Sequence, residues 1–130
     1  MPALIDTSVL VDYTRGRRTD QVAKFSHLVA SGDVLIGDLV LCEFLRGLDT
    51  EQEAWRAQQA FERFPILELC GSGIAIEAAR NYRLLRALGI TVRKTIDLIV
   101  GTYCIRHSIP LLHNDRDYDP MEHHLGLKVF

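Results

Sequence analysis

Short apolar segments that alternate with helical patterns constrain the fold of this chain most strongly. Five segments have the length and apolar character of strands: residues 3–6, 33–37, 66–69, 109–112 and 127–130. The helical patterns cover residues 19–31, 38–45, 51–64, 75–85 and 95–107. Brief apolar strands separated by helices favour a parallel sheet with helices on both faces. We therefore predict an α/β fold around a mostly parallel, five-stranded sheet.

Four acidic residues stand where a carboxylate is costly. Asp6 ends the first strand and Asp115 follows the fourth. Glu43 and Asp97 lie in helical runs that are otherwise largely apolar. The carboxyl ends of parallel strands emerge at one edge of a sheet, where ligands bind in such folds. Because an unpaired carboxylate loses several kcal/mol of solvation away from water, we predict that these side chains converge on a divalent cation.

The composition narrows the class of protein. The 130 residues are 48% hydrophobic and 25% charged, so we predict one domain covering residues 1–130. The formal net charge of -2 disfavours a passive nucleic-acid-binding module more than an enzyme, because such a module needs its own basic field. No apolar run approaches the roughly 20 residues of a membrane span. The N-terminal segment also lacks a signal-peptide pattern, so we expect a cytoplasmic protein without membrane contact.

Four sequence blocks place these acids in a recognisable order. They are Leu-Ile-Asp-Thr-Ser-Val-Leu at 4–10, Glu-Phe-Leu-Arg-Gly at 43–47, Ile-Asp-Leu-Ile-Val at 96–100 and Leu-Leu-His-Asn-Asp-Arg-Asp-Tyr at 111–118. Together they resemble the PIN-domain nucleases, most closely the VapC toxins of bacterial VapBC toxin-antitoxin pairs. One departure is His113, which stands where many members of that family carry threonine or serine.

The resemblance implies both a fold and a function. It implies a PIN-like three-layer α/β sandwich and a metal-dependent endoribonuclease that cleaves RNA. It further implies a homodimer that is restrained by a cognate VapB-type antitoxin.

The chemistry of phosphodiester hydrolysis also explains a cluster of carboxylates. The reaction needs an activated water near neutral pH and a clamp on the phosphate oxygens, and one or two magnesium ions supply both. Magnesium prefers oxygen ligands, and manganese is the alternative metal. Two acids about 4 Å apart without a cation would repel by roughly 4 kcal/mol at an effective dielectric near 20. The cluster is therefore expected to hold a metal ion, or to keep one member protonated.

The predicted roles follow from this chemistry. We assign Asp6, Asp97 and Asp115 as direct or water-bridged metal ligands. Glu43 is either a further ligand or the group that orients the attacking water. Asp117 and Ser8 are second-rank candidates. Basic residues close in sequence to the acids are predicted to attract RNA phosphates: Arg15, Arg17, Arg18, Arg93 and Lys94.

Two other functions match part of the pattern. A magnesium-dependent phosphatase of the haloacid-dehalogenase type also has an aspartate after its first strand. It requires a second aspartate two residues later, where this chain has Ser8, and a lysine near the last acidic block. A noncatalytic, receiver-like signalling module keeps its acids but needs a lysine after its last strand. We find neither lysine at the required place and favour the nuclease.

The aromatic residues of the segment 51–64 have two interpretations. Trp55, Phe61 and Phe64 are predicted to belong to the core. The alternative is that part of this segment faces the antitoxin or a second subunit, because partners commonly bury aromatic anchors.

Overall fold

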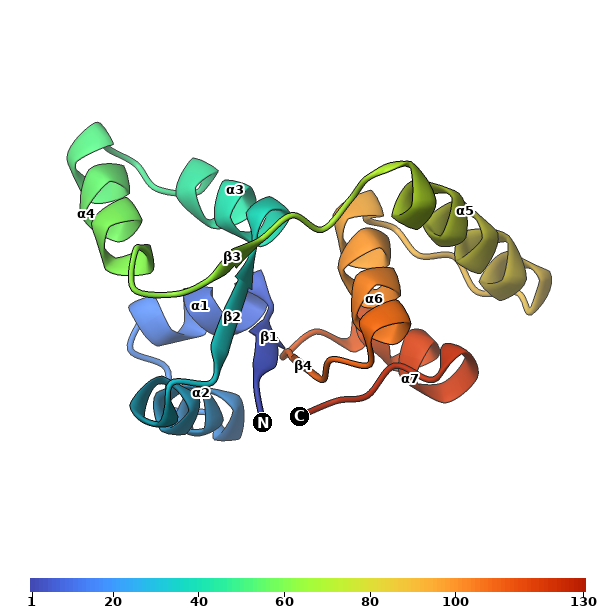
Figure 1. Ribbon diagram of the computed structural model, residues 1–130, viewed down its shortest axis with the longest axis horizontal. Coiled ribbons are helices and arrows are strands. Elements are labelled where there is room, and N and C mark those ends of the chain that lie inside the picture. The colour runs from blue at the N-terminus through green and yellow to red at the C-terminus, as the bar shows by residue number, and fades with distance from the viewer.

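A parallel sheet of four strands lies at the centre of the molecule (Figure 1). The computed structural model describes residues 1–130. The strands are β1 (Ala3–Ile5), β2 (Val34–Gly37), β3 (Ile66–Leu67) and β4 (Leu111–Leu112), in the order β3-β2-β1-β4. All three pairings are parallel, and Leu4 of β1 pairs with Leu35 on one side and Leu111 on the other. The predicted parallel α/β architecture is therefore confirmed.

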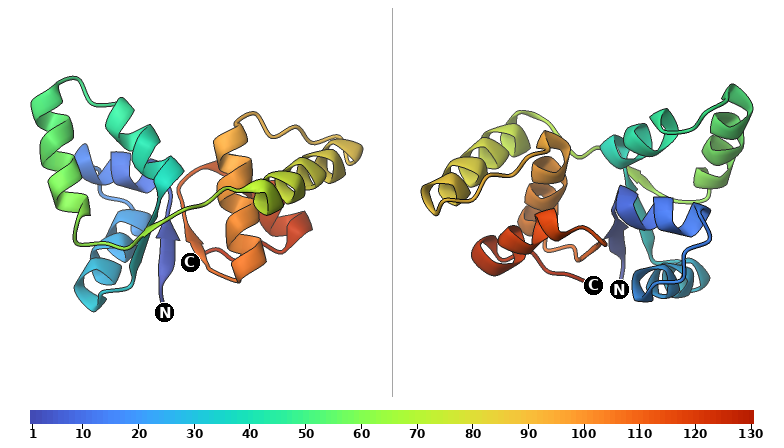
Figure 2. Two further views of the ribbon diagram at one scale, coloured as in Figure 1. Left: turned by 45° about the horizontal axis from the view of Figure 1, so that its top comes forward. Right: turned by 180° about the vertical axis from the view of Figure 1, so that it is seen from behind.

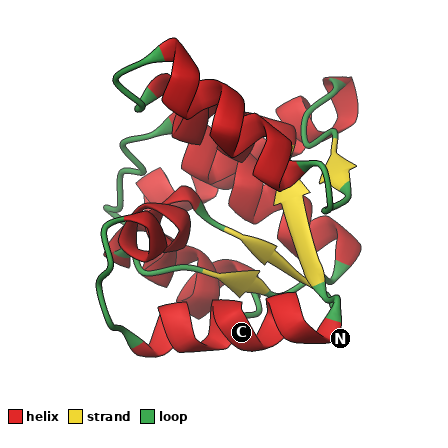
Figure 3. Cartoon of the chain, turned by 90° about the vertical axis from the view of Figure 1, so that its left-hand side faces the viewer, coloured by secondary structure: helices red, strands yellow, loops and turns green.

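Helices form a layer on each side of the sheet. They are α1 (Thr7–Thr14), α2 (Asp20–Ser31), α3 (Asp38–Arg46), α4 (Glu51–Phe61), α5 (Ser72–Ala87), α6 (Thr95–His107) and α7 (Asp119–Leu125), with a short 3-10 turn, η1 (Arg116–Tyr118), before α7. Figure 2 shows α1 to α4 on one side of the strands and α5 to α7 on the other. Figure 3 is viewed from the side on which α1 to α4 lie, so that one helical layer is in front of the strands and the other is behind them. None of these helices is long and apolar enough to cross a membrane.

The predicted fifth strand is wrong. Residues 127–130 contribute one isolated parallel bridge, between Val129 and Leu111. The segment leaves α7 with the Leu127 N–H bonded to the Met121 carbonyl, and it meets a β4 that is only two residues long. Only Leu111 bonds to this segment: its N–H donates to the Lys128 carbonyl and its carbonyl accepts the Phe130 N–H, so no ladder forms.

Several helix ends also differ from the predicted ones. Asp6 is the N-cap of α1, which lies outside the helical ranges given above. Helix α4 ends at Phe61, three residues before the predicted end at residue 64. Helix α7 was not predicted at all, because its polar sequence looks like a solvated loop. The predicted limits of α2 and α6, at residues 19–31 and 95–107, agree with the structure to within one residue.

The core explains why the acids lie near one edge of the sheet. Twenty-four buried apolar residues form one cluster, and all three residues of β1 are completely buried within it. Asp6 follows β1 directly, so its position is fixed by the core. Helix α6 is buried along most of its length, as predicted, and carries Asp97 in its first turn. Short, rigid elements therefore carry the acidic residues.

Candidate active site

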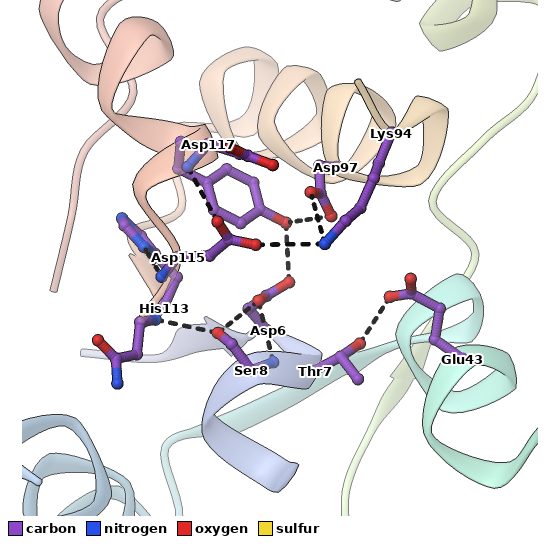
Figure 4. A network of polar contacts seen from close by, with 11 residues as sticks. Asp6, Thr7, Ser8, Glu43, Lys94, Asp97, His113, Asp115 and Asp117 are labelled. Atoms are coloured by element: carbon purple, nitrogen blue, oxygen red, sulfur yellow. Dashed lines mark hydrogen bonds and ion pairs between the residues drawn. The ribbon is translucent and has the colours of Figure 1, made fainter. Parts of the chain in front are cut away.

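A polar cavity of about 410 Å³ opens where β1 and β4 end. Its lining is almost entirely hydrophilic: Asp6, Thr7, Ser8, Val11, Asp12, Arg17, Thr19, Glu43, Lys94, Asp97, Asn114 and Asp115. The four acids singled out in the sequence all belong to this lining. Figure 4 shows them facing one another at one edge of the sheet, contributed by the residue after β1, by α3, by α6 and by the loop after β4. The structure thus brings them together, while their individual roles stay predictions.

Asp6 is buried and held firmly by its neighbours. Its side chain is only 3% exposed. The Oδ2 atom accepts hydrogen bonds from the Ser8 backbone N–H at 3.0 Å and from the Ser8 hydroxyl at 2.6 Å. Tyr118 donates its hydroxyl to the Oδ1 atom at 2.8 Å. Capping of α1 therefore fixes this carboxylate at the end of the central strand.

Asp97 is equally buried but is only partly satisfied. The Tyr118 hydroxyl lies 3.3 Å from its Oδ1 atom, while its Oδ2 atom is buried without a hydrogen-bond partner. Burial, reinforced by the charge of Asp6, raises the pKa of Asp97 to about 7, against the partial opposition of Lys94. A buried carboxylate oxygen without a partner is rare and costly in proteins. It is the atom in this cavity that most needs a cation.

Asp115 and Asp117 come from the turn after β4. Asp115 caps η1, because its Oδ1 atom accepts the backbone N–H of Asp117 at 2.9 Å. One carboxylate oxygen from each of Asp97, Asp115 and Asp117 can be chosen so that the three lie within 4.8 Å of one another. Asp117, a second-rank candidate in the sequence, therefore stands in the tightest carboxylate group.

Glu43 faces this group from α3 (Figure 4). The start of α3 is fixed by Asp38, whose carboxylate accepts the backbone N–H groups of Leu39 at 2.8 Å and Leu69 at 3.1 Å. The hydroxyl of Thr7 donates to Glu43 Oε1 at 2.7 Å. This bond links α1 to α3 across the cavity and leaves the other carboxylate oxygen of Glu43 unbonded in the hydrogen-bond network.

Lys94 provides a positive charge inside the cavity. Its Nζ atom lies 3.5 Å from Asp115 Oδ2 and 3.9 Å from Asp97 Oδ2. The charge of Asp97, followed by that of Asp115, raises the pKa of Lys94. In the sequence Lys94 was noted only as a basic residue near the acids. Its spacing of three residues from Asp97 places both at the start of α6, and that spacing is the signal for the contact.

Asp12 was missed in the sequence, although it belongs to the cavity. It is 6% exposed and accepts from Arg17 Nη1 at 2.9 Å and from Asn114 Nδ2 at 3.0 Å. The Asn114 bond, ahead of the Arg17 bond and charge, lowers the pKa of Asp12 despite its burial. The backbone N–H of Asn114 also donates to the Ser8 hydroxyl at 3.0 Å. The i, i+4 spacing of Ser8 and Asp12 on α1 was the available signal.

His113 and Tyr118 contact the acids but do not line the cavity. The ring of His113 packs on that of Tyr118, with centroids 4.8 Å apart. His113 Nδ1 accepts the backbone N–H of Asp115 at 3.1 Å. The other ring nitrogen, Nε2, is buried and has no hydrogen-bond partner. Burial, and next the charge of Asp6, raises the pKa of Tyr118 well above its ordinary value. The tyrosine hydroxyl therefore remains a neutral donor.

Comparison with known proteins identifies the family to which this arrangement belongs. Residues 3–123 match the family model described as the PIN domain. The chain belongs to the PIN-domain family. Membership in this family argues against the phosphatase and receiver-like alternatives, whose lysines the chain also lacks.

Individual PIN-domain relatives agree with this assignment. VapC ribonuclease Mb1587 of Mycobacterium bovis is 26% identical over 118 residues, covering 89% of this chain and 88% of the relative. A structure of VapBC2 from Rickettsia felis, bound to a DNA fragment from their promoter, has a TM-score of 0.78 at 16% identity and covers 100% of this chain and 98% of that one. A toxin-antitoxin complex from Klebsiella pneumoniae has a TM-score of 0.68 at 20% identity, covering 96% and 94%. The two solved structures share the fold.

The cavity satisfies the chemical requirements of a magnesium or manganese site. The acidic side chains that line it offer carboxylate oxygens as metal ligands, and oxygen is the ligand atom that both metals prefer. The unpartnered, buried Oδ2 atom of Asp97 is the observation that a bound cation would explain. Neither histidine nor cysteine lines the cavity, which disfavours a site built for zinc. The residues present therefore fit the metal that the PIN-domain family implies.

Proposed function

We propose that this PIN-domain protein is a metal-dependent endoribonuclease that acts in the cytoplasm as the toxin of a toxin-antitoxin pair. The observation that carries the proposal is the Oδ2 atom of Asp97, which is buried without a hydrogen bond among further carboxylates in a polar cavity. The name of the relative from Mycobacterium bovis, a VapC ribonuclease, supports RNA as the substrate. A magnesium ion is the expected cofactor, with manganese as a substitute.

The carboxylates have two proposed roles: the aspartates hold the metal, and Glu43 acts on the attacking water. Asp97 and Asp115, together with Asp117, form the closest set of possible metal ligands. Asp6 is linked to this set through the Tyr118 hydroxyl, and both of its carboxylate oxygens already accept hydrogen bonds. When bound, the metal would lower the pKa of a coordinated water and neutralise charge on the phosphate. The residues of this chain supply the rigid oxygen donors that such a cation needs.

Glu43 is placed to orient the attacking water. Its Oε1 atom is fixed by the Thr7 hydroxyl, which leaves the Oε2 atom to accept a hydrogen bond from that water. A carboxylate in hydrogen-bond reach of the water can also take up its proton. Glu43 is therefore assigned as the positioning group and general base, while Thr7 fixes its orientation.

Two basic residues in the cavity lining are assigned to the RNA backbone. Arg17 is held by Asp12 yet keeps a side chain that is 57% exposed, and Lys94 keeps one that is 56% exposed. Such cations attract phosphates in a salt-dependent manner and provide no base specificity. Single-stranded or looped RNA is the expected form of the substrate, because the scissile bond must reach the bottom of a cavity.

An RNA cleavage assay tests the proposed function. Purified protein is incubated with total RNA in magnesium, manganese or chelator, beside the Asp6→Asn variant. Cleavage is expected only for the unsubstituted protein and only when metal is supplied, because a neutral amide cannot help to hold the cation. Gel analysis of the fragments measures the result. Equal cleavage by the two proteins, or cleavage in chelator, would contradict the proposal.

We further propose that a VapB-type antitoxin restrains this toxin, which forms a homodimer. An apolar groove of about 310 Å³ lies between α1, α2, α3 and α4 and is lined mainly by hydrophobic side chains: Leu10, Tyr13, Phe25, Val29, Phe44, Ala57, Ala60, Phe61 and Phe64. The structural neighbour from Klebsiella pneumoniae is a toxin-antitoxin complex.

Trp55 on α4 is 61% exposed, so its predicted place in the core is wrong, whereas Phe61 is buried as predicted.

The groove makes the antitoxin contact testable with two neighbouring substitutions. Ala60→Glu places a charge in the groove and is expected to weaken antitoxin binding by about thirtyfold or more, because an unpaired charge at an interface costs about 2 kcal/mol or more. Gln59→Glu makes the same change in charge on an exposed residue that does not line the groove. Calorimetric titration with the antitoxin measures both. Equal affinities for the two variants would place the antitoxin elsewhere.

A further inference from the structure

Tyr118 joins two carboxylates that come from distant parts of the chain. Its side chain is completely buried. Its hydroxyl oxygen lies 2.8 Å from Asp6 Oδ1 and 3.3 Å from Asp97 Oδ1. Asp6 stands at the end of β1 and Asp97 in the first turn of α6.

These contacts determine which carboxylate oxygens remain free. Asp6 Oδ2 is engaged by Ser8, and its Oδ1 atom is engaged by Tyr118. On Asp97 the Oδ1 atom faces Tyr118, while the Oδ2 atom is the buried one without a hydrogen-bond partner. The terminal torsion of an aspartate is broad, so burial alone does not fix this orientation. The hydroxyl supplies the missing restraint.

Tyr118 is itself held by the segment that carries the other acids. Its ring packs on His113, which in turn accepts the backbone N–H of Asp115. Asp115 caps the short turn that contains Asp117 and Tyr118. A displacement of the tyrosine would therefore disturb the whole acidic turn. The ring and the hydroxyl contribute separately, because the ring packs while the hydroxyl bonds.

We propose that Tyr118 is a positioning residue for the cation: its hydroxyl holds Asp6 and Asp97 so that the free oxygen of Asp97 is presented to the metal. This inference rests on the proposed function. A neutral hydroxyl suits the task, because its one O–H group is shared between the nearer Asp6 and the more distant Asp97 and does not cancel the negative charge that attracts the metal. Hydrogen-bond partners behind metal ligands typically contribute 10-fold to 100-fold in metal affinity or activity. Phenylalanine would keep the packing and lose this contribution.

The test uses Tyr118→Phe and manganese alone as the probe. Calorimetric titration of the metal-free protein with Mn²⁺ is expected to show a dissociation constant raised by about 10-fold to 100-fold. The Mn²⁺ concentration for half-maximal RNA cleavage is expected to rise by the same factor, with a much smaller change in rate at saturating metal. Tyr103→Phe is the matched control, because Tyr103 is half-buried on α6, packs on His107 and does not line the cavity.

A second replacement keeps the test decisive if phenylalanine disturbs folding. Tyr118→Met also removes the hydroxyl, and methionine adapts to irregular apolar space. Circular dichroism identifies which variant is folded. Unchanged Mn²⁺ affinity in a folded variant would overturn the role of Tyr118 and leave the proposed nuclease intact. If the unsubstituted protein bound Mn²⁺ more tightly than the variant but did not cleave RNA, the nuclease would fail and the inference would stand. If it bound no Mn²⁺, both would fail.

Discussion

Asp97→Asn is expected to reduce metal-dependent RNA cleavage by about a thousandfold or more. A bound cation stabilises the transition-state charge by several kcal/mol, and each 1.4 kcal/mol corresponds to about a factor of ten in rate. The substitution neutralises the carboxylate whose Oδ2 atom is buried in the cavity without a hydrogen bond. Initial rates on a defined RNA, at saturating magnesium, measure the loss.

A matched aspartate separates this effect from a general loss of helix capping. Asp20 stands in the first turn of α2, as Asp97 stands in the first turn of α6, but it is exposed and outside the cavity. Asp20→Asn removes an equivalent interaction with the helix dipole, worth about 0.3 to 1 kcal/mol, and is expected to leave cleavage unchanged. Similar rates for the two variants would show that Asp97 has only a structural role.

The metal-free protein is expected to lose stability as the pH rises from about 4 to 8. The pKa of Asp97 is raised from 3.8 to about 7 in the folded state. Between these values the folded protein retains a proton that the unfolded chain has released. The stabilising contribution is therefore complete below pH 4 and is lost as the pH rises through 7, by roughly 4 kcal/mol in total. Urea unfolding at a series of pH values measures this change.

Two comparisons assign the pH dependence to Asp97. The Asp97→Asn variant cannot titrate at this position, so its stability is expected to change much less over the same range and to exceed that of the unsubstituted protein at pH 8. Saturating magnesium should raise the stability of the unsubstituted protein at pH 8, because ligand binding stabilises the folded state. A parallel pH profile in the variant would show that other groups are responsible. Stability gained by losing a functional charge is a familiar compromise at active sites.

The sequence was sufficient to predict the sheet edge that carries the acids. Asp6 and Asp115 follow apolar segments too short for anything but strands, and parallel strands end at the same edge. Glu43 and Asp97 were predictable because an acid in an otherwise apolar helix needs a partner. The pattern was less informative at the C-terminal segment 127–130, where pairing depends on how the chain leaves α7 and meets β4, a tertiary property.

The supporting residues were harder to predict because they look ordinary in the sequence. Tyr118 reads as a core aromatic residue, and only the fold shows that its hydroxyl reaches two carboxylates. Asp12 lies in an amphipathic helix, where an acid usually faces solvent, yet Asn114 and Arg17 enclose it. Trp55 has the helical spacing of a core residue, but no element covers it in the structure. Contacts between distant segments decide each of these cases.

Anomalous diffraction from crystals grown with manganese tests the central claim most directly. We expect an anomalous peak in the polar cavity, within bonding distance of the Oδ2 atom of Asp97, with an oxygen of Asp115 or Asp117 also coordinated directly or through water. Crystals of the Asp97→Asn variant should lack the peak. A cavity without manganese at saturating concentration, or a peak remote from Asp97, would contradict the account.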